Sequence, residues 1–114
     1  MIRGKVVLVP FPFDDLSATK VRPAACLTEP IGQHHHVVLA FISSQVSSEP
    51  LQTDIFLDPK QDDFITTGLR VPSTLKLHRI MTVSTDLFHR ELGALSSRLL
   101  AEVTEKLKLL FGIY

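Results

Sequence analysis

The sequence predicts a small, mainly β domain, namely a mostly antiparallel β-barrel or half-barrel that ends in one helix. Two observations lead to this prediction. Five or six segments have the length and apolar pattern of short strands, and the only long helical pattern lies near the C-terminus. The chain of 114 residues is the size of one domain, residues 1–114, with room for a hydrophobic core. Short strands followed by a single helix are typical of small barrels.

The first three predicted strands are the most apolar segments of the chain. Residues 5–9 and 24–28 are rich in apolar side chains, and residues 10–22 between them are predicted as a loop. Residues 37–42 are almost continuously apolar, which predicts a strand buried on both faces, or nearly so.

A shorter strand is predicted at residues 53–57, between a polar loop at 43–52 and an Asp-Pro pair that ends it. Residues 60–72 show neither a strand nor a helix pattern. They are predicted as an irregular connection in which Gly68 turns the chain.

The next strand is predicted at residues 73–82, where successive side chains point to opposite faces. The alternation places Lys76 and His78 together on one face. The opposite face is expected to bear Leu75, Leu77, Arg79 and Met81.

The C-terminal helix is predicted to begin after Ser96 as N-cap, to run to about Phe111 and to stop at Gly112. One face of it bears an apolar stripe, which is either core or a dimer surface: Leu99, Leu100, Val103, Leu107 and Leu110.

Composition limits the classes of function. Twelve cations balance twelve anions, so the net charge is zero, and any attraction to nucleic acid must come from a local cluster. The single cysteine, Cys26, excludes an internal disulfide and a multi-cysteine metal site, and it is expected to be a small buried hydrophobe. No apolar run approaches the roughly 20 residues of a membrane span. We therefore expect a cytoplasmic protein.

Arg22 is the most informative residue for function. Steric pressure from Pro23 disfavours the helical region for Arg22 and holds it extended at the entrance of a strand. A guanidinium on restrained backbone suits a phosphate or a carboxylate. The alternative is structural, with Arg22 pairing with Asp14 or Asp15 to brace the loop.

Several short motifs occur in the order found in one family. Gly4-Lys5-Val6-Val7 leads the first strand, Lys20-Val21-Arg22-Pro23-Ala24 opens the second, and Ser43-Ser44 ends the third. Gly68-Leu69, Ser73, Thr82 and Leu92-Gly93-Ala94-Leu95 follow at similar spacing. In these motifs the chain resembles the PemK/MazF toxins of type II toxin–antitoxin systems over nearly its whole length.

The resemblance implies an SH3-like barrel that commonly forms a homodimer. It also implies a metal-independent endoribonuclease that cuts single-stranded RNA through a 2′,3′-cyclic phosphate and needs no cofactor. The expected partners are the RNA substrate and a cognate antitoxin protein.

Catalytic roles are expected for Arg22, Ser43 and His78. By resemblance, Arg22 binds phosphate and stabilises the transition state, and Ser43 stands where relatives often have threonine. His78 lies where some relatives have a catalytic aspartate, and an imidazole is suited to proton transfer near neutral pH. Lys20, Ser44 and Lys76 are expected to hold the RNA backbone.

Two other clusters have simpler interpretations. At most two of His34, His35 and His36 can share a strand face, so a solvated turn is favoured over a metal site. Asp62 and Asp63 are interpreted as solvated turn residues, because adjacent carboxylates seldom converge on one bond.

Two rival functions remain open at this point. One is a non-catalytic barrel that binds a protein target, as the gyrase-poisoning branch of the fold does. The other is a barrel that binds RNA without cleaving it. Arg22 and the polar strand face at Lys76 and His78 favour the endoribonuclease.

Overall fold

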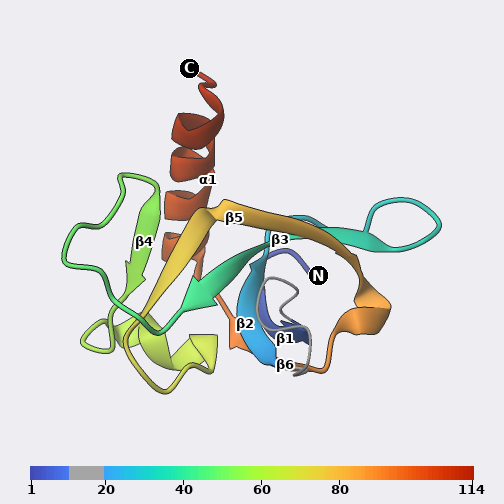
Figure 1. Ribbon diagram of the computed structural model, residues 1–114, viewed down its shortest axis with the longest axis horizontal. Helices are drawn as coiled ribbons and strands as arrows, with labels where there is room; N and C mark the ends of the chain where they lie inside the picture. The colour runs from blue at the N-terminus through green and yellow to red at the C-terminus, as the bar shows by residue number, and fades with distance from the viewer. Residues whose placement is uncertain (11–19) are drawn as a thin grey trace.

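The computed structural model describes residues 1–10 and 20–114 (Figure 1). Asp14 and Asp15, the predicted alternative partners of Arg22, lie outside the described residues. The described elements follow one another as β1 Lys5–Pro10, β2 Val21–Cys26, β3 His36–Ser43, β4 Asp54–Leu57, the 3₁₀ turn η1 Asp62–Thr67, β5 Ser73–Ser84, the 3₁₀ turn η2 Thr85–Leu87, β6 Arg90–Ala94 and α1 Ser97–Phe111.

The strands form one six-stranded sheet in the order β4-β5-β3-β2-β1-β6. All of its described neighbours pair antiparallel. The sheet curls into a half-barrel, and β5 arches from β4 across β3 (Figure 1). This architecture, with α1 after the last strand, confirms the predicted mainly β fold with a C-terminal helix.

The strand β5 is not a regular ladder. Ala40 of β3 pairs with Ile80 and Ile42 pairs with Leu75, so one residue of β3 lies opposite four residues of β5 between these two pairs. Extra residues on one strand bend it and interrupt the alternation of faces. The strict alternation predicted for residues 73–82 is therefore wrong near Arg79. The irregular pairing changes which face of the sheet the side chains after Leu77 occupy.

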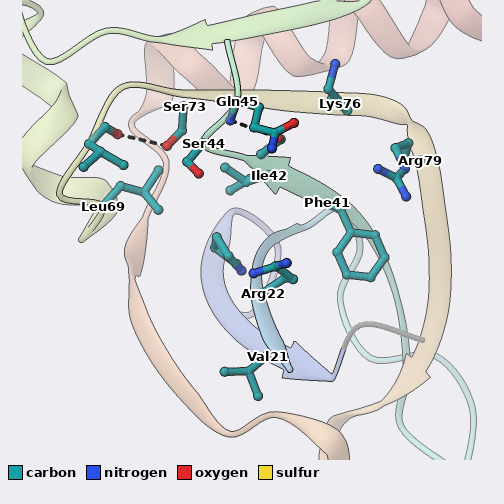
Figure 2. Close-up of a pocket in the computed structure, with 13 residues that line it drawn as sticks. Val21, Arg22, Phe41, Ile42, Ser44, Gln45, Leu69, Ser73, Lys76 and Arg79 are labelled. Atoms are coloured by element: carbon teal, nitrogen blue, oxygen red, sulfur yellow. Dashed lines mark hydrogen bonds between the residues drawn. The ribbon is translucent and has the colours of Figure 1, made fainter. Parts of the chain in front are cut away.

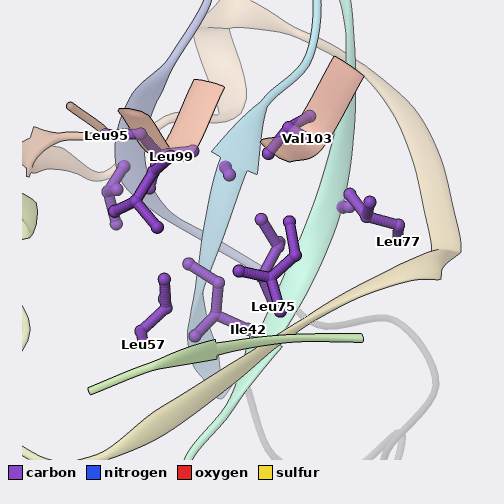
Figure 3. Packing of buried hydrophobic residues seen from close by; sticks show 11 residues of the cluster. Ile42, Leu57, Leu75, Leu77, Leu95, Leu99 and Val103 are labelled. Atoms are coloured by element: carbon purple, nitrogen blue, oxygen red, sulfur yellow. The ribbon is translucent and has the colours of Figure 1, made fainter. Parts of the chain in front are cut away.

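The two faces of the sheet contribute to two apolar clusters, because neighbouring residues of a strand point to opposite sides. One cluster lies between the sheet and α1 and includes Ile42, Leu75, Leu99 and Val103 (Figure 3). The other, on the opposite side of the sheet, includes Val7, Val9, Ala24, Cys26, Val37, Leu39, Phe41 and Val83. The central strand β3 is thus buried on both faces, as predicted.

Cys26 is fully buried, and burial raises the pKa of its thiol to about 11. A neutral thiol in an apolar cluster behaves as a small hydrophobe. The structure agrees with the interpretation of Cys26 as a core residue.

Helix α1 has the predicted caps. The Ser96 side chain accepts a hydrogen bond from the Leu99 backbone N–H at 3.1 Å, and Gly112 ends the helix in the left-handed conformation at φ 67°. Leu99 and Val103 are buried, and the other stripe residues pack partly against the same cluster. The stripe is therefore core.

Asp63 ties η1 to the start of α1. Its carboxylate accepts hydrogen bonds from the Ser96 hydroxyl at 2.6 Å and from Arg98 at 2.8 and 2.9 Å. These bonds, from Arg98 first and Ser96 second, lower the pKa of Asp63 to about 2. Asp63 is thus a structural tie between two elements, which corrects the interpretation of it as a solvated turn residue.

Strand β6 has no clear sequence pattern, and the sequence does not predict it as a separate strand. It pairs with β1, and Gly93 lies so close to η1 that a Cβ there would meet the Thr66 carbonyl oxygen at 2.2 Å. Gly68 is equally close to β6, with the Leu92 carbonyl oxygen 2.0 Å from a Cβ position. Two glycines therefore let η1 and β6 approach each other.

None of the helices in the described part of the chain is long and apolar enough to cross a membrane.

Candidate functional site

A cavity of about 500 Å³ opens between β2, the end of β3 and β5 (Figure 2). The segment between η1 and β5 supplies a further wall. The side chains around it are Val21, Arg22, Pro23, Phe41, Ile42, Ser43, Ser44, Gln45, Leu69, Val71, Ser73, Lys76 and Arg79.

Arg22 enters this cavity from β2. It pairs across the ladder with Val9 of β1, and the buried segment Ala24–Cys26 fixes the strand that follows it. Pro23 after it disfavours a helical backbone. Figure 2 shows the exposed guanidinium in the middle of the cavity, beside Phe41.

The end of β3 provides two hydroxyls and an amide. Ser43 pairs with Thr74 of β5, and its hydroxyl oxygen accepts a hydrogen bond from the Gln45 backbone N–H at 3.1 Å (Figure 2). A hydroxyl that accepts a hydrogen bond keeps its own O–H for donation. Ser43 is half-buried and Ser44 is exposed, so both can reach a ligand that enters from solvent.

Strand β5 contributes Lys76 and Arg79. Lys76 pairs with Asp54 of β4, and its ammonium lies 3.6 Å from a carboxylate oxygen of Asp54. Arg79 lines the cavity although the alternation predicted it on the face of Leu75 and Leu77. The irregular ladder of β5 explains the difference.

The described lining contains three cations and no carboxylate. The hydroxyls of Ser43 and Ser44 and one amide supply neutral donors, while Phe41, Leu69 and Val71 supply apolar and aromatic surface. The buried Ser73 hydroxyl donates its proton to the Val71 backbone oxygen at 2.9 Å. Positive charge and hydroxyl donors suit a phosphate group, and apolar or aromatic surface suits a nucleobase. The cavity can therefore bind a phosphodiester together with an adjoining base.

Two predicted site residues are not brought into this cavity. His78 is exposed and is not among the residues that line it, although Lys76 is. Lys20 is also exposed, and it stands immediately before β2 outside the same lining. Of the six predicted residues, the structure thus brings four together: Arg22, Ser43, Ser44 and Lys76.

His34 and His35 lie at the turn before β3, His36 is the first residue of β3, and all three are exposed. The rings of His34 and His36 stack with centroids 5.8 Å apart, and His35 has φ 52°. Within residues 1–10 and 20–114, no group of three or more His, Cys, Asp or Glu side chains is placed to hold a metal ion. His34 and His35 thus lie in the predicted solvated turn, whereas His36 pairs with Ser84 of β5.

A family model described as "PemK-like, MazF-like toxin of type II toxin-antitoxin system" matches residues 2–111. A search among curated proteins finds no match.

Solved structures share the fold. The Mycobacterium tuberculosis toxin MazF-mt6 has a TM-score of 0.72 at 20% identity, covering 96% of this chain and 98% of that chain. The MazE–MazF structure from Deinococcus radiodurans has a TM-score of 0.75 at 19% identity, covering 100% and 97%. An endoribonuclease in complex with its cognate antitoxin, from a mycobacterial species, has a TM-score of 0.73 at 15% identity, covering 100% and 97%. At these identities the likeness shows the fold.

Proposed function

Because the chain belongs to the PemK-like, MazF-like toxins of type II toxin–antitoxin systems, we propose that it is an endoribonuclease that cleaves single-stranded RNA in the cavity around Arg22. One observation supports this most directly. Arg22, Ser43 and Lys76 come from three separate strands and line one cavity without a carboxylate among its described lining. Relatives of the same fold are described as endoribonucleases.

In the proposed reaction the nucleophile belongs to the substrate. The ribose 2′-oxygen attacks the neighbouring phosphorus, the bond from phosphorus to the 5′-oxygen breaks, and the products are a 2′,3′-cyclic phosphate and a 5′-hydroxyl. The 2′-OH proton passes to water, and the leaving oxygen takes a proton from water, because the cavity is open to solvent at Arg22 and Ser44. No nucleophilic side chain and no cofactor are required.

The protein's contribution is to stabilise the negative charge that grows on the phosphorane. Arg22 presents a planar fork of N–H donors, and Ser43 adds a hydroxyl donor at the end of β3. Along β5, Lys76 and Arg79 add positive charge that holds the RNA backbone equally in the ground state and in the transition state, and Ser44 extends the row of donors. Arg79 thus joins the residues predicted from the sequence.

The proposal gives Lys20 and His78 a place outside the cavity. Both are exposed, so they can contact RNA that extends beyond the cleaved phosphate. Proton transfer by His78 stays a prediction from the sequence, which a mutant can test.

The proposed partners follow from the family. MazE–MazF and an endoribonuclease with its cognate antitoxin are complexes of the same fold. We propose that a cognate antitoxin restrains this protein and that it forms a homodimer. Light scattering of the purified protein, alone and with the product of a neighbouring small reading frame, tests both partners.

The test of the proposed activity is the chemistry of the product ends. Purified protein is incubated with a mixed-sequence single-stranded RNA in excess EDTA, and the fragments are analysed by mass spectrometry. We expect 2′,3′-cyclic phosphates and 5′-hydroxyls, since the described residues form no metal-ligand cluster. Bound but intact RNA would support the non-catalytic alternative. If cleavage is lost on chelation and restored by a divalent ion, the metal-independent reaction is overturned.

A further inference from the structure

The ion pair between Asp54 and Lys76 lies between two cavities. Lys76 lines the cavity around Arg22, and Asp54 lines a second one of about 480 Å³, beside Phe56 and Lys106. No motif in the sequence singles out Asp54. Asp54 lies beside Lys76, a predicted RNA-binding residue, because the two residues pair across the ladder of β4 and β5.

Asp54 is held firmly. Its residue exposure is only 6%, and one carboxylate oxygen accepts a hydrogen bond from the Leu51 backbone N–H at 3.0 Å. Its own backbone oxygen accepts a hydrogen bond from the Lys106 ammonium at 2.6 Å. The next residue, Ile55, is in the core. A carboxylate fixed in this way can fix the cation beside it.

The ammonium of Lys76 is drawn toward that carboxylate. The two groups are 3.6 Å apart, and the Lys76 side chain is only 20% exposed. Partial burial strengthens such an attraction by lowering the local dielectric. The Leu51 N–H donates to one carboxylate oxygen of Asp54, Oδ2. The other oxygen, Oδ1, is buried and has no hydrogen-bond partner among the described residues.

Figure 2 shows the consequence for the cavity. The Lys76 side chain points away from Arg22, whereas Arg22 lies in the middle of the cavity. At 3.6 Å the pair is an ion pair rather than a hydrogen bond, so a second anion in the cavity can compete for the ammonium.

We infer that Asp54 is a positioning residue that holds the Lys76 ammonium at the far wall of the cavity, so that RNA must compete with the Asp54 carboxylate for that cation. This inference rests on the proposed function, because it takes RNA as the competing anion. The protein has no net charge, and this positioning by Asp54 would hold one of its cavity cations, Lys76, in a fixed place.

The test is a double-mutant cycle on RNA binding. Asp54→Asn keeps the acceptor for Leu51 and removes the charge, so RNA should bind about three- to fivefold more tightly at low salt, the effect of one freed ion pair. In the presence of Lys76→Met the same change should have less than about a twofold effect. KM should fall without a rise in kcat, because the freed lysine adds uniform binding.

Asp58→Asn is the matched control. Asp58 follows β4, and its carboxylate accepts a hydrogen bond from the Lys60 backbone N–H. Asp58→Asn therefore removes the same amount of negative charge as Asp54→Asn without changing the partner of Lys76. Equal tightening in the Asp58 and Asp54 variants, or equal tightening with and without Lys76, would mean that only net charge matters and would overturn the inference. Thermal unfolding of each variant shows that folded proteins are compared.

A second measurement needs no RNA. The ¹⁵N-labelled ammonium signal of Lys76 in NMR should broaden or shift in Asp54→Asn and stay unchanged in Asp58→Asn, because only the first change releases it. An unchanged signal in both variants would overturn the positioning role. If the wild type bound no RNA, the proposed function would fail, and this signal would still decide whether Asp54 holds Lys76.

Discussion

Arg22 is extended before any ligand arrives, because Pro23 restricts its backbone and the buried segment after it fixes the strand. Little conformational entropy then remains to be lost at the backbone when a phosphate binds. Arg79 reaches the same cavity by a different route, through the irregular pairing of β5 with β3. Two guanidiniums therefore approach one cavity from different strands.

The role of His78 is tested by His78→Gln. Because the imidazole is exposed and outside the cavity lining, we expect turnover to fall by less than about threefold, far below the 10²- to 10⁴-fold typical of a lost general acid or base. The measurement is the pH–rate profile of wild type and mutant on one RNA. A loss above a hundredfold, with an ionisation near neutral pH missing from the mutant, would make His78 the proton-transfer residue predicted from the sequence.

At the scale of residues, the sequence predicts those members of the site that depend on local rules. Arg22 is found from the proline that follows it, and Ser43 and Ser44 from their place at the end of an apolar strand. Arg79 could not be found, because the extra residues of β5 arise from its pairing with two other strands and leave no periodic signal. The face predicted for Arg79 was wrong for this reason.

At the scale of elements, η1 and α1 are joined by one carboxylate. Asp63 is fixed by the N-cap residue Ser96 and by a two-bond contact with Arg98. The same turn packs against β6 at Gly93, so η1 links the last strand to the helix. This tie places the start of α1 against the sheet.

Asp63→Asn should therefore lower the thermal stability at neutral pH. The pKa of Asp63 is lowered from 3.8 to about 2 in the folded protein, so the charged form stabilises the fold above the unfolded value. That stabilisation is lost as the pH falls from 3.8 through about 2. Melting temperatures of wild type and mutant, measured from pH 7 down to about pH 2, should differ at pH 7 and converge near pH 2. A constant difference at every pH would show that the charge of Asp63 contributes nothing.

The elements themselves were predictable where they are apolar and regular. Strands β1, β3 and β4 and helix α1 lie close to their predicted ranges. Strand β2 begins three residues earlier than the predicted range of 24–28, so Arg22 lies within the strand. Strand β6 was missed, because its glycine and charged residues give it no strand pattern; its place depends on contact with η1 and β1. Most of the predicted loop 10–22 lies outside the described residues.

At the scale of the whole molecule, zero net charge means that RNA affinity depends on a local cluster. The cavity concentrates Arg22, Lys76 and Arg79 on one side of the half-barrel. This grouping requires the fold, because the three residues lie on two strands that are not neighbours in the sheet.

The salt dependence of RNA binding measures that cluster. We expect about two to four phosphate contacts, with log K falling by roughly 0.7 per contact for each tenfold rise in salt. Binding of a short single-stranded RNA, titrated at several salt concentrations, gives the slope. A much steeper slope would reveal a larger electropositive surface, such as one formed by two protomers.

The proposed cleavage of RNA in the cavity around Arg22 is tested by the single-turnover rate of Arg22→Ala. We predict a loss of about 10²- to 10³-fold, because a preorganised donor to the phosphorane is removed. Arg22→Lys should recover only part of the rate, since it lacks the planar fork. Arg90→Ala, at an exposed arginine of β6 outside the cavity lining, should cleave like wild type, and all variants should melt at similar temperatures. Wild-type cleavage by folded Arg22→Ala protein would contradict the account.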